Sequence, residues 1–293
     1  MRFDKTFIAI RDRSILEILD LSLHVVADHI GRLFWLWLIG VVPWVALDLW
    51  LIGGLIDSDE GNGYYFWVML CLIVSQAQVG TSFITHYLGQ AMFVGRPGIW
   101  DTFKGVFKTS PYFIFSHGVL RLVIPTVLAC LLLNEYDLDV LVGVGVVLIP
   151  LIVGTGLLVR SLRPFVSEIL LLERTPIRSK DENQVHFSRR SKSLHGAAGS
   201  DLLGRFLTAG MAAIPLGFAA FSMFVTIDSV LNIRANSDQS YLPYYWIIAL
   251  WIIAGLMSVV RFLSYIDIRI RQEGWAVELR MRAEGQLLMD NLE

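Results

Sequence analysis

The sequence predicts an all-α, polytopic membrane protein with six transmembrane helices, and three observations support this prediction. First, the chain of 293 residues is 55% hydrophobic and 17% charged, with a mean hydropathy of +0.60, whereas soluble domains carry about 25% charged residues. Second, the apolar residues form six runs near the ~20-residue length that crosses a bilayer. Third, lysine and arginine are concentrated in alternate connections between these runs.

The six apolar runs divide the chain into five regions. We expect spans over about residues 30–56, 64–93, 112–133, 138–159, 202–231 and 242–265. The regions are an N-terminal amphipathic helix (1–29), spans one to four (30–159), a basic connection (160–201), spans five and six (202–265) and a C-terminal helix (266–293).

The segment before the first span has the pattern of an amphipathic helix. Ser14 followed by Glu17 fits a capping box, in which each side chain satisfies a backbone amide at the helix start. Glu17, Asp20, His24 and Asp28 recur at intervals of three and four, so they form one polar stripe opposite an apolar face. We expect this helix to pack against the cytoplasmic end of the bundle, with a free interfacial anchor as the alternative.

Two further short helices are expected between the spans. Residues 97–111 place Ile99, Phe103 and Phe107 on one helical face between two prolines. Pro164 can open a second short helix that ends before Pro176. Residues 175–199 are polar and predict a loop rather than a helix.

The distribution of basic residues predicts the orientation of the chain. Of its 24 Lys and Arg, 22 lie in the N-terminal segment, the connection between spans two and three, the central stretch 160–205 and the tail. The opposite connections contain only Arg234, which satisfies the positive-inside rule. We therefore expect a multi-pass protein of the bacterial inner membrane with both termini in the cytoplasm.

Four polar residues at or near membrane depth are candidate site residues, because polar groups there are costly and often functional. Arg121 lies inside the third expected span, where it can snorkel, pair with Glu168 or line a substrate or ion site. Gln76 and Gln78 point to different faces of the second span, which favours hydrogen bonds between helices over a shared site.

The central stretch and the tail are candidate interaction surfaces on the cytoplasmic side. The basic run can contact lipid head groups or a membrane or cytoplasmic protein partner, and no nucleic-acid partner is expected. The tail patch can lock the tail against the central stretch or form a solvated helix held by i,i+4 pairs. The residues concerned are Arg189, Arg190 and Lys192 in the basic run, and Asp267, Arg269, Arg271 and Glu273 in the tail patch.

Catalytic and cofactor motifs are not found in the sequence. It contains no phosphate-binding GxxxxGK[ST], no HExxH and no GxSxG. Its six histidines have no metal-ligand spacing, and Cys71 and Cys130 lie singly within apolar spans as small hydrophobic residues. We therefore expect no enzymatic activity, no metal and no cofactor.

Three patches carry a resemblance to known membrane proteins: residues 163–176, 188–206 and 265–279. Their order is similar to that of uncharacterised bacterial six-span inner-membrane proteins. The run Tyr265, Asp267, Arg269, Arg271, Glu273 resembles the end of the membrane domain of glycerophosphoryl diester phosphodiesterases. The resemblance implies a multi-pass envelope protein that belongs to an assembly. It does not imply phosphodiesterase activity, because six spans in this chain leave no room for the catalytic barrel.

The sequence thus favours a non-enzymatic membrane subunit or scaffold of a cell-envelope complex. The alternative is a permease or channel for a small solute or lipid, with Arg121, Gln76 and Gln78 along its path. Clustering of these three residues around one cavity would favour the alternative, and burial in dry, paired contacts would count against it. An intramembrane enzyme would instead need converging carboxylate, His or Cys groups.

Overall fold

The computed structural model describes residues 14–56, 62–94, 97–119, 121–134, 138–173, 187–196, 199–231 and 241–272. Over these ranges the chain is helical and forms no strand, which confirms the predicted all-α class. The α-helices are α1 (Ile15–Ile52), α2 (Asn62–Gly80), α3 (Ser82–Val94), α4 (Ile99–Ile114), α5 (Val123–Asn134), α6 (Leu138–Leu162), α7 (Val166–Glu168), α8 (Phe187–Gly196), α9 (Gly199–Val230) and α10 (Leu242–Gln272).

Four helical segments are long and apolar enough to cross a membrane: Ile15–Leu55, Gly63–Met92, Asp201–Val230 and Leu242–Arg269. A fifth arises if Val147–Leu162 and Val166–Glu173, which meet at an angle of 70°, are counted as one broken span. By length and composition the described residues therefore contain four or five spans, where the sequence predicts six.

The difference arises at the third expected span, which is not one continuous helix. α4 begins after Pro97 as expected but continues through Pro111 to Ile114, and a π-helical turn follows at 115–119. The chain then turns at Arg121 and Leu122, where Leu122 has a φ of 62°. Such a left-handed conformation interrupts a right-handed helix. The helix that follows, α5, has only 12 residues.

The first and last spans extend beyond the expected boundaries. α1 joins the predicted amphipathic helix to the first span in one helix of 38 residues, because no residue between them breaks the helical pattern. Its capping box is confirmed: Glu17 N–H donates to Ser14 Oγ over 3.3 Å, and Ser14 N–H donates to Glu17 Oε2 over 3.2 Å. α10 continues through the sixth span into the tail as far as Gln272, and residues 273–293 lie outside the described ranges.

The polar stretch predicted as a loop contains a helix, so that prediction was wrong for α8. Phe187 and Leu194 pack with Phe165, Tyr265 and Ile268 in a small apolar cluster. Burial of these apolar side chains stabilises the helix, although the segment as a whole is polar. Residues 174–186 of the same stretch lie outside the described ranges.

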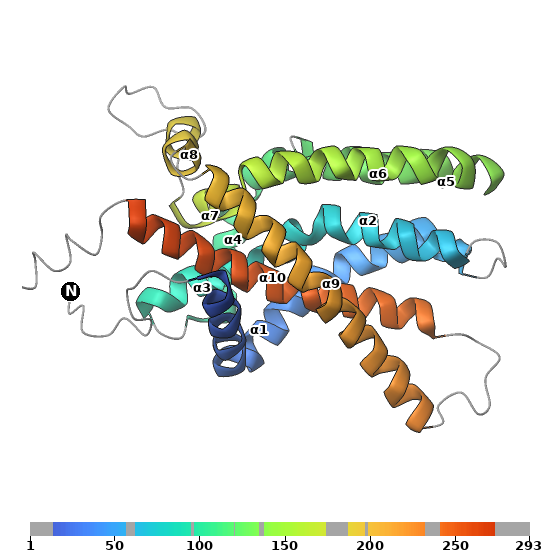
Figure 1. Ribbon diagram of the computed structural model, residues 1–293, viewed down its shortest axis with the longest axis horizontal. Helices are drawn as coiled ribbons and strands as arrows, with labels where there is room; N and C mark the ends of the chain where they lie inside the picture. The colour runs from blue at the N-terminus through green and yellow to red at the C-terminus, as the bar shows by residue number, and fades with distance from the viewer. Residues whose placement is uncertain are drawn as a thin grey trace, which may run out of the picture.

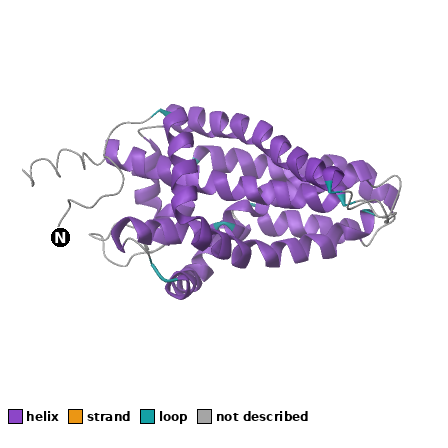
Figure 2. Cartoon of the chain, turned by 90° about the horizontal axis from the view of Figure 1, so that it is seen from below, coloured by secondary structure: helices purple, strands orange, loops and turns teal. Residues whose placement is uncertain are grey.

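α10 is the central helix of the bundle. It packs against α9, α1, α2, α3 and α8, while α2 also packs against α6 (Figure 1). Seen from below, the helices form one elongated bundle (Figure 2). The expected second span is built from α2 and α3, separated by a turn at Thr81.

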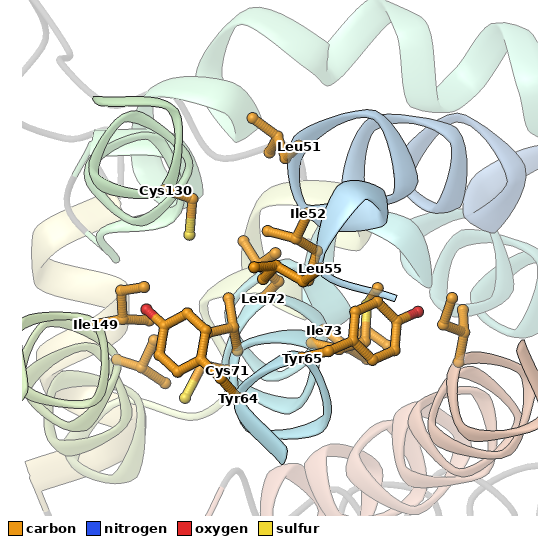
Figure 3. Close-up of a cluster of buried hydrophobic side chains, with 14 of the residues drawn as sticks. Leu51, Ile52, Leu55, Tyr64, Tyr65, Cys71, Leu72, Ile73, Cys130 and Ile149 are labelled. Atoms are coloured by element: carbon orange, nitrogen blue, oxygen red, sulfur yellow. The ribbon is translucent and has the colours of Figure 1, made fainter. Parts of the chain in front are cut away.

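The largest apolar cluster joins α1 and α2 to α5, α6 and α10. Tyr64 of α2 points toward Ile149, Tyr65 points to the opposite side of α2, and Leu72 lies beside Ile52 and Leu55 at the end of α1 (Figure 3). Cys71 and Cys130 are buried free thiols, as the sequence predicts. A second apolar cluster joins the first half of α1 to α3 and to the later part of α10.

Candidate functional site

A partly open cavity of about 700 Å³ lies between α2, α6, α9 and α10. Its size falls within the range of small-molecule sites, which are mostly apolar with a few polar groups. Apolar side chains form most of its wall, from Trp246 and Phe218 at one end to Phe165 at the other. The polar groups gather at the second end, where Arg160, Arg205 and Arg261 line the cavity.

Small residues on α9 create the space. Ala209, Gly210, Ala213 and Gly217 line the cavity and recur at three and four, so they lie on one face of that helix. A Cβ built on Gly210 would meet no atom within 4 Å. The face of α9 toward α2 and α6 therefore lacks the side-chain volume that would close the gap.

Arg160, at the end of α6, is 4% exposed. Its Nη1 donates to the carbonyl oxygen of Val74 over 2.5 Å, and its Nη2 donates to that of Ser75. Its Nε is buried without a hydrogen-bond partner. The structure shows no ion pair between Arg160 and a described carboxylate, so two neutral carbonyls are the acceptors of this buried charge.

Arg205, near the start of α9, is 9% exposed and joins two carboxylates. Its Nε lies 3.0 Å from Asp201 Oδ2, and its Nη2 lies 2.8 Å from Asp267 Oδ2. Asp267 also pairs with Arg271 over 3.1 Å, so one carboxylate serves two guanidinium groups. Arg205 Nη1 is buried and forms no hydrogen bond.

Arg261 of α10 is held by a buried carboxylate. Its Nε donates to Glu168 Oε1 over 2.6 Å, and its Nη2 donates to Thr85 Oγ1 over 3.3 Å. The Glu168 side chain is fully buried and that of Arg261 is 15% exposed. This pair connects α7 with α3 and α10, so it fixes the bent segment after Pro164 beneath the bundle.

Of the alternatives left open for Arg121, an ion pair with Glu168 is not seen, and Arg261 takes the hydrogen bond to that carboxylate. Arg121 is 3% exposed; its Nη1 donates to Gln78 Oε1 and its Nη2 to the carbonyl oxygen of Arg163 over 2.5 Å. His117 Nε2 lies 3.3 Å from Arg121 Nη1. The turn after the π-helix thus places Arg121 between α2 and the α6–α7 connection, at the bundle's polar end.

Gln76 belongs to a separate pair. Its Nε2 donates to Asp48 Oδ1 over 2.8 Å, and both side chains are fully buried. The interhelical hydrogen bonds expected for the two glutamines are therefore present, and they involve different partners. Of Arg121, Gln76 and Gln78, only Gln78 lines the cavity. The three predicted residues do not share one path.

A serine–histidine contact lies beside Arg121. His117 Nε2 is 3.0 Å from Ser167 Oγ, and its Nδ1 is 3.3 Å from the carbonyl oxygen of Phe113. This is the spacing of a nucleophile and its base. However, Ser167 and His117 are both fully buried, and neither lines the cavity. Among the described residues, no group of three or more His, Cys, Asp or Glu could hold a metal ion.

The predicted cytoplasmic surfaces are largely joined to each other. Glu173 accepts hydrogen bonds from Arg190 Nε over 2.6 Å and from Tyr265 Oη over 2.6 Å, and it lies 3.7 Å from Arg269 Nη1. The Asp267–Arg205 and Asp267–Arg271 ion pairs complete this contact. The tail patch therefore locks against the central stretch.

The remaining candidates of these surfaces have different positions. Arg189 and Lys192 are exposed on α8, whereas Glu273 lies outside the described ranges. The exposed pair leaves a smaller basic surface than the sequence predicts.

Sequence reasoning assigned Arg160, Arg205 and Arg261 to connections and to the tail, and so missed them as residues of a site. The feature of the sequence that could have identified these three arginines is their position. Each lies within about four residues of a span end on the same predicted side, and Arg205 follows Asp201 by one helical turn. Only the packing of α6, α9 and α10 shows that these side chains turn inward.

No family model, no curated protein and no solved structure matches this chain, so its candidate site rests on its own geometry.

Proposed function

We propose that this chain is a non-enzymatic, six-span protein of the bacterial cytoplasmic membrane that binds a lipid-like amphiphile in the cavity between α2, α6, α9 and α10. This site differs from the permease path predicted from the sequence, because Arg121 and Gln76 are buried in paired contacts and only Gln78 lines the cavity. The orientation, with both termini in the cytoplasm, is supported by the one-sided distribution of Lys and Arg.

One observation carries the proposal: the cavity is apolar along most of its length and polar at one end. Along α10 the lining runs from Trp246 to Arg261, a rise of about 22 Å at 1.5 Å per residue. That length exceeds the roughly 15 Å of hydrocarbon in one leaflet. A chain of methylene groups suits such a wall, and a polar head suits the end that carries Arg160 and Arg205.

A pair of α9 variants tests this function. Gly204 and Gly210 both have open space around a built Cβ, but only Gly210 lines the cavity. Native mass spectrometry of the protein purified in mild detergent should show a bound lipid in the wild type and in Gly204→Trp. The Gly210→Trp variant should lose it, because the indole fills part of the cavity. Equal lipid occupancy in the two variants would exclude this cavity as the binding site.

The scaffold function remains a second candidate, on the observation that Arg189 and Lys192 are exposed on α8 while neighbouring Arg190 is bound to Glu173. α8 is thereby held in place and presents two basic side chains. Crosslinking in native membranes, followed by mass spectrometry, should connect α8 to a stoichiometric partner if this function holds. A particle free of partners after crosslinking would count against it.

A further inference from the structure

We propose that the polar end of the cavity recognises the anionic head group of a glycerophospholipid, with Arg160 and Arg205 as ligands of its phosphate. This inference rests on the proposed function, since it names the class of lipid that the cavity takes. The acyl chains occupy the apolar length toward Trp246 and Phe218.

Arg160 provides the first argument. A buried guanidinium that lacks a carboxylate partner is costly, because carbonyl hydrogen bonds replace only part of the lost hydration. Its two Nη atoms are already fixed by Val74 and Ser75 of α2, so the side chain is held in one position. The buried Nε has no acceptor in the protein. Because Arg160 lines the cavity, a phosphate bound there supplies the opposite charge that the protein does not provide.

Arg205 lines the cavity from α9. Its ion pairs engage Nε and Nη2, while the buried Nη1 has no acceptor in the protein. Arginine favours phosphate because its planar donors match the spacing of the oxygens. Arg160 on α6 and Arg205 on α9 both line the same end of the cavity, so a head group bound there lies beside two guanidinium groups.

The charges around this end favour a head group with net negative charge. Arg121 and Arg160 are buried and hydrogen-bond to neutral oxygens, and no ion pair with a described carboxylate is seen for either. Arg261 pairs with Glu168, and Arg205 pairs with Asp201 and Asp267. A zwitterionic head would add a cation to an already positive site, whereas phosphatidylglycerol adds an anion.

The test compares two lipids on the delipidated full-length protein. Dioleoyl phosphatidylglycerol and dioleoyl phosphatidylcholine carry identical acyl chains, so native mass spectrometry titrations isolate the effect of the head group. We expect phosphatidylglycerol to bind about tenfold more tightly, because both lipids carry the phosphate but only phosphatidylcholine brings a cation beside the guanidinium groups, and like charges this close repel. Arg205→Gln should remove this preference, and Arg189→Gln, on the exposed face of α8, should retain it.

Arg205→Gln also breaks two ion pairs, so each variant is first checked for a single symmetric gel-filtration peak. Arg160→Lys offers a second variant that keeps the charge but loses the planar guanidinium, and it should weaken the binding of both lipids, because both carry the phosphate that Arg160 holds. If neither variant folds, the comparison of the two lipids on the wild type, with Gly210→Trp as the blocked cavity, still decides the inference.

The outcomes separate the two proposals. Equal affinity for the two lipids, abolished for both by Gly210→Trp, overturns the head-group inference and leaves the lipid cavity standing. Binding of both lipids that Gly210→Trp does not change overturns the cavity itself. Free glycerol 3-phosphate, added at the concentration of the lipid, should not compete. If it displaces phosphatidylglycerol, the site is one for a soluble phosphate ester and the inference is overturned.

Discussion

Replacing Gly40 by alanine should loosen the contact between α1 and α2, because the two backbones touch there. A Cβ on residue 40 would lie 2.0 Å from the carbonyl oxygen of Gly80 and 3.1 Å from the ring of Phe83. Ordinary contacts to a Cβ begin near 3.4 Å. The helices would therefore have to separate by more than an ångström. The clashing atom is a backbone carbonyl oxygen, which cannot move away by a change of side-chain rotamer.

Gly31 is the matched control, since it lies on the same helix with no atom within 4 Å of a built Cβ. Alanine gains about 1 kcal/mol of helix propensity at either position, so the difference between the two variants isolates the clash. Overpacking costs about 1–3 kcal/mol. Gly40→Ala should thus be less stable than Gly31→Ala by that amount.

The assay is thermal unfolding in a mild detergent, followed by gel filtration of the surviving folded fraction. A difference of about 1–3 kcal/mol corresponds to a melting temperature roughly 2–12 °C lower for Gly40→Ala, at roughly 2–4 °C per kcal/mol. Equal melting temperatures would refute the reasoning. They would mean that α1 and α2 do not approach as closely at Gly40 and Gly80 as the structure shows.

Three further predictions follow from buried contacts. Glu168→Gln should lower the free energy of unfolding by about 3–5 kcal/mol because it leaves Arg261 buried without its carboxylate, and the double variant Glu168→Gln/Arg261→Gln should recover part of that loss in denaturant unfolding. Burial holds the pKa of His195 below its usual value, so the unfolded chain binds more protons, and stability should fall as the pH drops below about 6.5. A Ser14→Ala variant, which removes the cap of α1, should lose about 0.5–2 kcal/mol by the same unfolding measurement.

Each of these predictions has a control. For the Glu168 prediction the control is Asp20→Asn, which changes the Asp20–His24 pair, whose side chains are 75% and 72% exposed. This variant should lose less than about 0.5 kcal/mol of stability. A loss as large as that of Glu168→Gln would contradict the prediction. For the second, His195→Gln cannot titrate, and acid losses parallel to the wild type would contradict it. For the third, Glu17→Gln keeps a side-chain acceptor for the amide of residue 14 and should stay near the wild type.

The His195 prediction depends on which ring nitrogen carries the proton. Nε2 accepts from the N–H of Phe165 over 3.4 Å, and Nδ1 donates to the carbonyl oxygen of Ser191 over 2.7 Å. The contact at Nε2 requires the neutral ring, because a proton on Nε2 would face a donor, whereas the contact at Nδ1 is compatible with either form. Arg121 and Arg163 also disfavour the charged form. The neutral form is therefore stabilised in the folded chain, and its contribution is fully present above about pH 7.

The features that sequence predicts here are those set by local pattern. Apolar runs of span length, the capping box at Ser14 and Glu17, and the isolated thiols all depend on residues close in the chain. The broken third span could not be predicted in this way. Residues 112–133 are apolar enough for a helix, and the turn at Leu122 arises where Arg121 reaches α2 and the α6–α7 connection.

The partners of the buried charged residues could not be predicted from the sequence either. Glu168 lies close to several arginines along the predicted membrane depth, and depth alone cannot distinguish Arg121 from Arg261. The bend of 70° after α6 directs Glu168 toward α10, which settles the pairing. The cavity depends on the same tertiary information, because the small residues of α9 leave a gap only where α2 and α6 do not fill it.

The central helix α10 is synthesised after the helices that it packs against. Trp37 Nε1 donates to the carbonyl oxygen of Trp251 over 3.0 Å, across 214 residues of sequence. Trp246 Nε1 donates to that of Phe66 over 3.1 Å. α1 and α2 are thus synthesised long before their principal neighbour exists. A chain that stops before residue 242 would leave the faces of α1 and α2 that contact α10 uncovered.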